Sequence, residues 1–219
     1  MRELRPGLWH WDAPHPEWTE GEPWPQTVSS YAIDDGERLL LFDPLAVPSE
    51  IEGRAADRRP VIVLTAPWHE RDTQSLLERL EAPVYAPAPD TAEDLMQKFG
   101  LTREQAGEGS PDLAWLRAGD RYEAHFYTPA DRPLGARVFS GRVDNDVVLW
   151  LEDHRAVVAG DSLADFGRGL EIVPGWLPPG VTQEQIAERL HPLLELPVEL
   201  VLAAHGGPFD RAALERALS

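Results

Sequence analysis

The 219-residue chain contains no cysteine. This absence excludes disulfide bonds, thiolate zinc sites and cysteine nucleophiles, so any bound metal must be held by His and carboxylate side chains. Basic residues are also scarce, because 20 Lys and Arg stand against 38 Asp and Glu, which gives a formal net charge of −18. A field of that sign repels phosphate backbones and anionic membranes. We therefore expect no nucleic-acid partner and no membrane partner.

Long apolar runs are missing as well. No stretch approaches the length of a membrane span, and the N-terminus, Met-Arg-Glu-Leu-Arg-Pro, lacks the apolar segment of a signal peptide. We therefore expect a cytoplasmic protein. With 42% hydrophobic residues, the chain can bury a substantial core, and we expect residues 1–219 to form a single domain.

The sequence contains three short apolar runs, and each is followed by polar side chains. They are Val61–Thr65, Ala156–Ala159 and Leu200–Ala204. Short runs rich in Val and Leu are typical of buried strands, and ligands in α/β sheets usually bind at the carboxyl ends of such strands. The polar residues that follow these runs are His69, Asp72, Asp161 and His205. We expect their side chains to converge on one cleft.

The remaining patterns place these runs in a mixed α/β order. Val28–Ile33 and Arg38–Phe42 flank Asp-Asp-Gly-Glu, which predicts a β-hairpin. An amphipathic segment over residues 72–80 follows the strand at residues 61–65 and precedes apolar Val84 and Tyr85, which indicates a β-α-β unit.

Short helices and a strand meander are expected next. Capping pairs Asp90 with Glu93 and Thr102 with Gln105 predict two short helices in a surface insertion. Strand-like runs then begin at Tyr122 and continue to residue 159 as a meander. A helix capped by Thr182 and Gln185, a strand over residues 198–204 and a last helix from Asp210 complete the order.

The N-terminal stretch is rich in tryptophan and proline. Four of the eight Trp residues lie before residue 25, and the prolines among them prevent a helix. We expect a strand followed by an ordered loop over Asp12–Trp24. Two roles are open for its indoles: they cover a ligand cleft, or they pack on the edge of the sheet as ordinary core.

This order of elements resembles the metallo-β-lactamase fold, a four-layer αββα sandwich, over essentially the whole chain. Three motifs carry the resemblance: Leu41-Phe42-Asp43-Pro44 after an early strand, Val157-Val158-Ala159-Gly160-Asp161-Ser162, and Leu202-Ala203-Ala204-His205-Gly206-Gly207. In that family, the Asp of the second motif bridges two metals and the His of the third is a terminal ligand. Asp43, which precedes a proline, is expected to act as an acceptor in a turn.

The central motif departs from the family pattern Thr-His-x-His-x-Asp-His. The stretch Thr65-Ala-Pro-Trp-His-Glu-Arg-Asp72 places His69 on the second His, Arg71 on the Asp and Asp72 on the last His, and it leaves the first His without a counterpart. The family's Pro-Gly-His-Thr turn corresponds to Thr128-Pro-Ala-Asp-Arg132, with Asp131 as the candidate ligand and His125 as a weaker one. Trp176 falls in a region that borders the substrate cleft in this fold.

Two functions follow from the resemblance and the residues. In the first, His69, Asp131, Asp161 and His205 hold one divalent metal (Zn, Fe or Mn), Asp72 orients a ligand or water, and the site hydrolyses a small ester, lactone, amide or phosphoester. In the second, the active site is degenerate and free of metal, and it binds a small molecule or a protein partner.

Arg71 is the residue that most distinguishes this chain from the family it resembles. A guanidinium is permanently charged and cannot bind a metal, and beside two metal ions it would face strong repulsion. We therefore expect no dinuclear centre. Arg71 is expected either to pair with Asp161 and leave at most one metal near His69, or to fill the place of the second metal.

Overall fold

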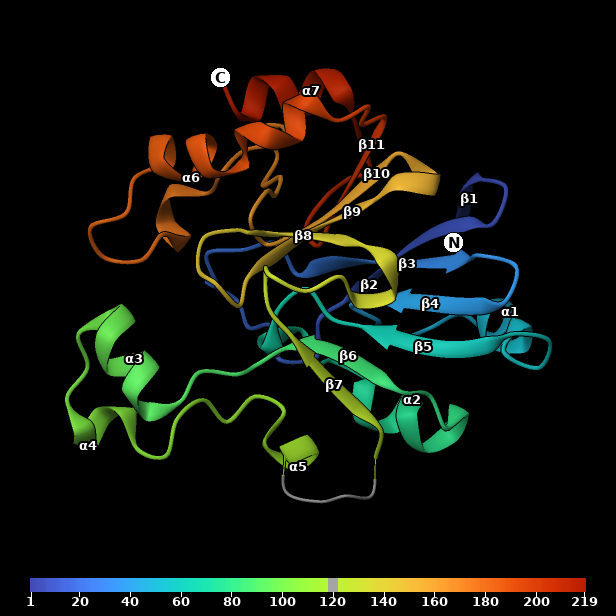
Figure 1. Cartoon of the computed structure of the whole chain (residues 1–219), viewed down its shortest axis with the longest axis horizontal. Helices are drawn as coiled ribbons and strands as arrows, with labels where there is room; N and C mark the ends of the chain where they lie inside the picture. Colours follow the sequence, from blue (N-terminus) through green and yellow to red (C-terminus); the bar gives the residue numbers. More distant parts are fainter. Residues whose placement is uncertain (118–121) are drawn as a thin grey trace.

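Two β-sheets packed face to face form the centre of the molecule in the computed structural model, which describes residues 1–117 and 122–219 (Figure 1). The first sheet has the order β1-β2-β3-β4-β5-β6-β7. Its strands are Arg2–Arg5 (β1), Leu8–Pro14 (β2), Thr27–Asp34 (β3), Arg38–Phe42 (β4), Arg59–Val63 (β5), Val84–Pro87 (β6) and Ala124–Tyr127 (β7). Strands β1 to β4 are antiparallel, whereas β4 to β7 run parallel.

The second sheet has the order β12-β11-β10-β9-β8. Its strands are Arg137–Ser140 (β8), Val147–Leu151 (β9), Ala156–Gly160 (β10), Leu200–Ala203 (β11) and Phe209–Asp210 (β12). Strands β10 and β11 are parallel, and the other neighbours are antiparallel. Apolar side chains from both sheets, including Phe42, Val63 and Val158, pack together between them.

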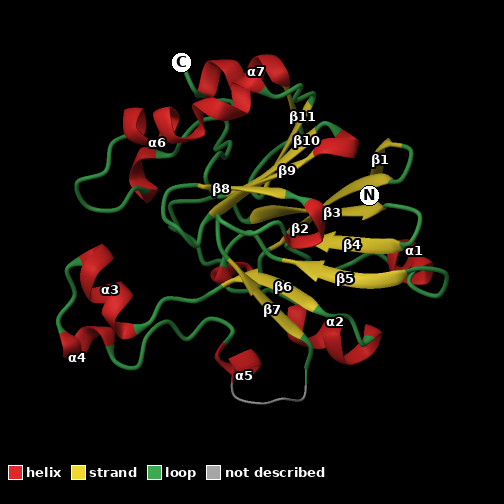
Figure 2. Ribbon diagram, viewed as in Figure 1, coloured by secondary structure: helices red, strands yellow, loops and turns green. Residues whose placement is uncertain are grey.

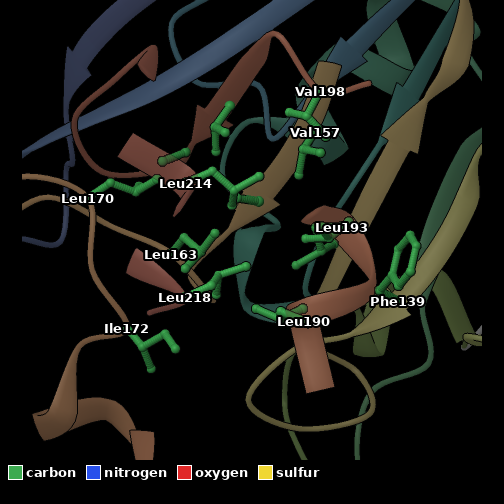
Figure 3. Close-up of a cluster of buried hydrophobic side chains, with 14 of the residues drawn as sticks. Phe139, Val157, Leu163, Leu170, Ile172, Leu190, Leu193, Val198, Leu214 and Leu218 are labelled. Atoms are coloured by element: carbon green, nitrogen blue, oxygen red, sulfur yellow. The ribbon is translucent and has the colours of Figure 1, made fainter. Parts of the chain in front are cut away.

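Helices cover the outer face of each sheet, so the fold has four layers (Figure 2). Helices α6 (Gln183–Leu190) and α7 (Arg211–Ala217) pack on the second sheet, and Figure 3 shows Leu190, Leu193 and Leu214 in the cluster that joins these layers. Helices α1 (Ser49–Arg54) and α2 (Thr73–Leu80) cover the first sheet. This arrangement confirms the αββα sandwich.

The other helices are short. The segment between β6 and β7 holds α3 (Ala92–Phe99), α4 (Arg103–Ala106) and α5 (Ala114–Arg117), and α3 and α4 stand away from the sheets (Figure 1). Single 3₁₀ turns are Pro67–His69, Pro133–Gly135, Glu152–His154, Pro174–Trp176 and His191–Glu195. None of the helices in residues 1–117 and 122–219 combines the length and the apolar character that a bilayer crossing needs.

Most of the expected elements are present, with two corrections. The hairpin of β3 and β4 and the parallel β5-α2-β6 unit are confirmed. The run from Tyr122, expected to open the meander, instead forms β7 at the edge of the first sheet, because it pairs in parallel with β6. The first capping box is made by Thr91 and Asp94, one residue later than predicted, because Thr91 supplies the hydroxyl that accepts from the Asp94 amide.

Candidate functional site

Four polar residues that follow parallel strands meet at one end of the sandwich. Asp43 follows β4 and His69 follows the neighbouring β5, while Asp161 and His205 follow the neighbouring strands β10 and β11. His69 Nε2 lies 3.1 Å from Asp161 Oδ1, and His205 Nε2 lies 3.6 Å from the same oxygen. The convergence of His69, Asp161 and His205 is confirmed, although 136 positions separate the first from the last.

Backbone contacts hold the two sheets close together at this end. Val147 N donates to Thr65 O at 2.9 Å, and Ser29 N donates to Ala204 O at 2.8 Å. Gly160, the last residue of β10, has φ of +53°, and a Cβ there would lie 2.6 Å from the Thr65 hydroxyl oxygen. A side chain at residue 160 would therefore push Thr65 away from its hydrogen-bond partners in the site.

Replacing Gly160 with Ala should destabilise the protein more than replacing Gly100 with Ala. Both glycines have positive φ, +53° and +66°, but no atom lies within 4 Å of the position of a Cβ at Gly100. In both variants an alanine must adopt a left-handed backbone conformation, which lowers the stability of each. Only Gly160→Ala adds overpacking, which typically costs about 1–3 kcal/mol. Urea unfolding measures the difference, and equal midpoints and slopes would show that Thr65 moves aside freely.

His69 lies buried between two carboxylates. On one side, its Nδ1 is 3.0 Å from Thr65 Oγ1 and 3.1 Å from Asp43 Oδ2, and Asp43 also accepts hydrogen bonds from the Thr65 amide and hydroxyl. On the other side, its Nε2 faces Asp161. Burial alone would lower the pKa of His69, but Asp161 and Asp43 outweigh it and raise the pKa to about 9. His69 is therefore an imidazolium at neutral pH. The carboxylate of Asp43 does not close a local turn as expected, because it accepts from Thr65 after the neighbouring strand and faces His69.

Asp161 is bound by two side chains that the sequence did not single out. Trp68 Nε1 donates to its Oδ2 at 2.9 Å, and Arg142 Nη2 donates to the same oxygen at 3.3 Å. Arg142 also donates from Nε to Asp146 Oδ2 at 2.6 Å, so one guanidinium joins two buried carboxylates. Burial would raise the pKa of Asp161, but His69 and Arg142 hold it well below the usual range.

Arg71 does not form the expected pair with Asp161. Its Nη1 donates instead to the carbonyl oxygens of Ser29 at 3.0 Å and of Asp43 at 2.5 Å. The guanidinium that bonds to Asp161 is that of Arg142. The prediction of an Arg71–Asp161 pair is therefore wrong, because the chain after the 3₁₀ turn Pro67–His69 directs Arg71 toward Ser29 at the start of β3 and Asp43 after β4. Arg71 nonetheless lines the same cavity as Asp161.

Asp72 does not line the cavity, so the prediction that it converges on the cleft with His69, Asp161 and His205 is wrong. Its Oδ2 accepts from the Ala46 amide at 2.6 Å, and its own amide donates to Pro44 O at 3.3 Å, so Asp72 ties the Arg71 turn to the turn after β4. It precedes α2, but its side chain makes no capping hydrogen bond. Arg71 and Ala46 both have positive φ, 42° and 48°, and this linkage holds two strained turns together.

Asp131 is not among the residues that line the cavity. Its Oδ2 accepts from the amide and the hydroxyl of Thr128, both at 2.8 Å, and these bonds close an exposed turn after β7. His125 stacks on Tyr85 at 4.4 Å and lies outside the cavity as well. The sequence could not reveal this, because the same Thr-x-x-Asp spacing serves a local turn equally well.

Aromatic rings surround His205. The centroids of Trp176 and Trp24 lie 5.2 Å and 5.5 Å from its ring, and that of Phe166 lies 5.8 Å away. Burial lowers the pKa of His205 to about 4, so the ring is neutral at pH 7. The expectation that the N-terminal loop flanks the cleft is confirmed by Trp24, whereas Trp9 and Trp11 are plain core.

A cavity of about 420 Å³ opens above these groups. This volume is within the usual range for small-molecule pockets. Its lining residues are His15, Trp24, Val28, Trp68, His69, Arg71, Phe99, Arg142, Val143, Asp161, Trp176, Pro178 and His205. Within the described part of the chain, two buried atoms of these residues have no hydrogen-bond partner, namely Asp161 Oδ1 and His205 Nδ1. An unsatisfied buried polar atom is costly unless a ligand or water completes it.

The donor set does not fit the metal centre that the resemblance implies. Over residues 1–117 and 122–219, no group of three or more His, Asp or Glu side chains is arranged so that it could hold a metal ion. The chemistry of the residues agrees, because one oxygen of Asp161 already accepts hydrogen bonds from Trp68 and Arg142. His69 and Arg142 form ion pairs with three buried carboxylates, those of Asp43, Asp146 and Asp161. Arg71 lines the same cavity.

Comparisons with solved structures show the metallo-β-lactamase fold. A metallo-β-lactamase family protein from Thermus thermophilus is 18% identical with a TM-score of 0.59, and the match covers 98% of this chain and 78% of that one. TTHA1623 in a di-iron-bound form is 22% identical, with a TM-score of 0.56 and coverages of 88% and 94%. A metallo-β-lactamase from Pseudomonas aeruginosa in a mono-zinc form is 13% identical, with a TM-score of 0.60 and coverages of 99% and 91%.

At these identities the likeness shows the fold alone. Relatives of this fold bind zinc or iron, and the fold is typical of metal-dependent hydrolases. In sequence, no family model and no curated protein matches the chain.

Proposed function

We propose that the chain uses the metallo-β-lactamase fold to bind a small molecule without a metal. The observation that carries this proposal is the saturation of Asp161 Oδ2 by Trp68 and Arg142, at 2.9 Å and 3.3 Å. In the family that the sequence resembles, the corresponding carboxylate bridges two metals. Here an indole and a guanidinium supply the donors and the positive charge that metal ions would supply.

The cavity supports the binding part of the proposal. Its walls combine apolar rings with a few buried polar groups, which is the usual composition of small-molecule sites. The charged floor is fixed by hydrogen bonds before any ligand arrives, because His69 is held by Thr65 and Asp43, and Arg142 is held by Asp146. A ligand therefore meets a preorganised surface and loses little entropy in ordering it.

A mononuclear hydrolase is the competing function, and one observation favours it. Asp161 Oδ1 accepts no hydrogen bond from the described residues, and His69 Nε2 and His205 Nε2 lie 3.1 Å and 3.6 Å from it. Both imidazoles therefore approach the same carboxylate oxygen from different strands. Two observations oppose it: Asp131 lies outside the cavity, and Asp161 Oδ2 is already bonded to Trp68 and Arg142.

Metal analysis separates the two functions. Protein incubated with Zn²⁺ and then dialysed should retain well below one zinc per chain by elemental analysis. Arg71→Asp should bind zinc more tightly than the parent, because it removes a positive charge and adds a carboxylate beside His69 and Asp161. Arg216→Asp, which makes the same charge change at an exposed position of α7, is the matched control and should behave as the parent does.

One result would contradict the proposal, and a second would contradict the role given to Arg71. One full zinc per chain in the dialysed parent protein would favour the hydrolase. Equal zinc binding by Arg71→Asp and Arg216→Asp would show that the charge of Arg71 is not what keeps metal out of the cleft.

A further inference from the structure

Arg71 carries free donors at the wall of the cavity. Its Nη1 is anchored by the carbonyl oxygens of Ser29 and Asp43 and, at 3.4 Å, by the hydroxyl of Ser30. Among the described residues, no hydrogen bond occupies its Nε or Nη2, and no carboxylate forms an ion pair with it. The guanidinium is thus held in place by neutral acceptors, and one whole edge with two parallel N–H groups remains available.

This free edge matches one kind of ligand group. Two parallel N–H donors on a planar cation fit the two oxygens of a carboxylate, and such bidentate bonds are stronger than neutral hydrogen bonds. An anion at Arg71 would also neutralise a partly buried charge that has no direct partner of opposite sign in the described structure. A carboxylate therefore suits this position better than a neutral amide or ester.

A second fixed feature is the oxygen of Asp161 that accepts no hydrogen bond from the described residues, Oδ1. Asp161 is 6% exposed, and its Oδ1 has no hydrogen-bond partner in the described structure. His69 Nε2 lies 3.1 Å away as an ion pair, but without the alignment of a hydrogen bond. A ligand hydroxyl or ammonium would supply the missing donor, and it would satisfy an acceptor that is costly to leave empty.

The remaining walls of the cavity are apolar. Trp24, Trp68 and Trp176 present indoles, and Phe99 from the end of α3 closes the same space. The Arg142 guanidinium lies 5.1 Å from the Trp176 ring and 5.7 Å from the Trp68 ring, so these indoles are held in place by cation–π contacts. Such walls favour an aromatic or branched apolar group and disfavour a sugar or another strongly hydrated body.

We infer that the cavity binds a small aromatic or apolar carboxylic acid that also bears a hydroxyl or amino group. The carboxylate accepts from Nε and Nη2 of Arg71, the hydroxyl or amino group donates to Asp161 Oδ1, and the apolar body lies among the three indoles. This inference rests on the proposed function, because it uses a carboxylate of Asp161 that no metal occupies.

Three probes test the inference on the intact protein by isothermal titration calorimetry. They are 3-phenyllactate, 3-phenylpropionate, which lacks the hydroxyl, and 3-phenyllactamide, which lacks the charge; both enantiomers of the chiral probes are used. We expect 3-phenyllactate to bind most tightly, with the affinity for each of the other two at least fivefold weaker.

Variants assign the contacts to residues. Arg71→Met should weaken the binding of 3-phenyllactate at least tenfold and change the binding of 3-phenyllactamide much less, because only the acid loses a charge-assisted pair. Arg216→Met removes the same charge from an exposed position of α7 and should change neither affinity. Circular dichroism confirms that the variants are folded, and the comparison of the three probes on the parent protein needs no variant.

Equal affinities for the acid and its amide would overturn the inference, as would the absence of binding by all three probes at millimolar concentration. An unchanged affinity of Arg71→Met for 3-phenyllactate would overturn the role of Arg71. None of these results depends on the zinc content of the protein. They would reject the proposed ligand class without rejecting the proposal that the cleft is free of metal. One zinc per chain would instead remove the proposed function itself.

Discussion

Replacing Arg142 with Met should lower the free energy of unfolding by about 3–5 kcal/mol, because it leaves charged groups buried without their partner. Arg142 bonds to both Asp146 and Asp161, whose side chains are 0% and 8% exposed. Met approximates the length of the Arg stem, so lost packing is a minor part of the effect. Urea unfolding at pH 7 measures the loss, which corresponds to a fall of about 6–20 °C in melting temperature for a chain of this size.

A second substitution checks the cause. Adding Asp146→Asn to the Arg142→Met variant removes one of the stranded carboxylates, so part of the lost stability should return. Arg168→Met breaks an exposed pair with Glu171, and it should cost less than about 1 kcal/mol. A loss below about 1 kcal/mol for Arg142→Met as well would mean that water or a rearranged side chain replaces the guanidinium.

The second large effect concerns pH. His69 has its pKa raised to about 9, whereas an unfolded His titrates near 6.5. Because the folded state binds this proton more tightly, His69 contributes stability that is fully present below pH 6.5 and is lost as the pH rises through 9. The difference in pKa corresponds to about 3 kcal/mol at about 1.4 kcal/mol per pKa unit.

The measurement is a comparison of the parent with His69→Gln from pH 6 to pH 10. The stability advantage of the parent should be largest near pH 6 and should shrink steadily up to pH 9–10. His191→Gln, a change at an exposed position, serves as the control and should give a constant difference. An advantage of the parent that grows with pH would show that His69 is neutral in the folded protein.

The sequence was sufficient to predict the fold and the centre of the site. Val- and Leu-rich runs mark the strands, and the ends of parallel strands must lie at one edge of a sheet, which is why His69, Asp161 and His205 could be placed together. The convergence of these residues followed from local patterns and one topological rule, whereas the four-layer sandwich was predicted from the resemblance to the metallo-β-lactamase fold.

The partners of Asp161 could not be predicted in this way. Arg142 lies in a loop between β8 and β9, and Trp68 lies in a 3₁₀ turn, so neither is part of a periodic pattern. Their role arises from contacts 19 and 93 positions apart in the chain. Arg71, in turn, was predicted correctly to lie at the cleft and wrongly to pair with Asp161, because a residue type does not reveal the direction of its side chain.

The backbone bonds that join the two sheets beneath the cleft bear on selectivity. Direct amide-to-carbonyl hydrogen bonds join Ser29 to Ala204 and Val147 to Thr65, which are segments far apart in the chain. The floor of the cleft therefore cannot widen or narrow without breaking these bonds. The rim is built differently, from the loop around Trp24, the turn at Trp176 and the end of α3 at Phe99. A change of preferred ligand during evolution would therefore proceed through substitutions in these three rim segments, over a floor that stays the same.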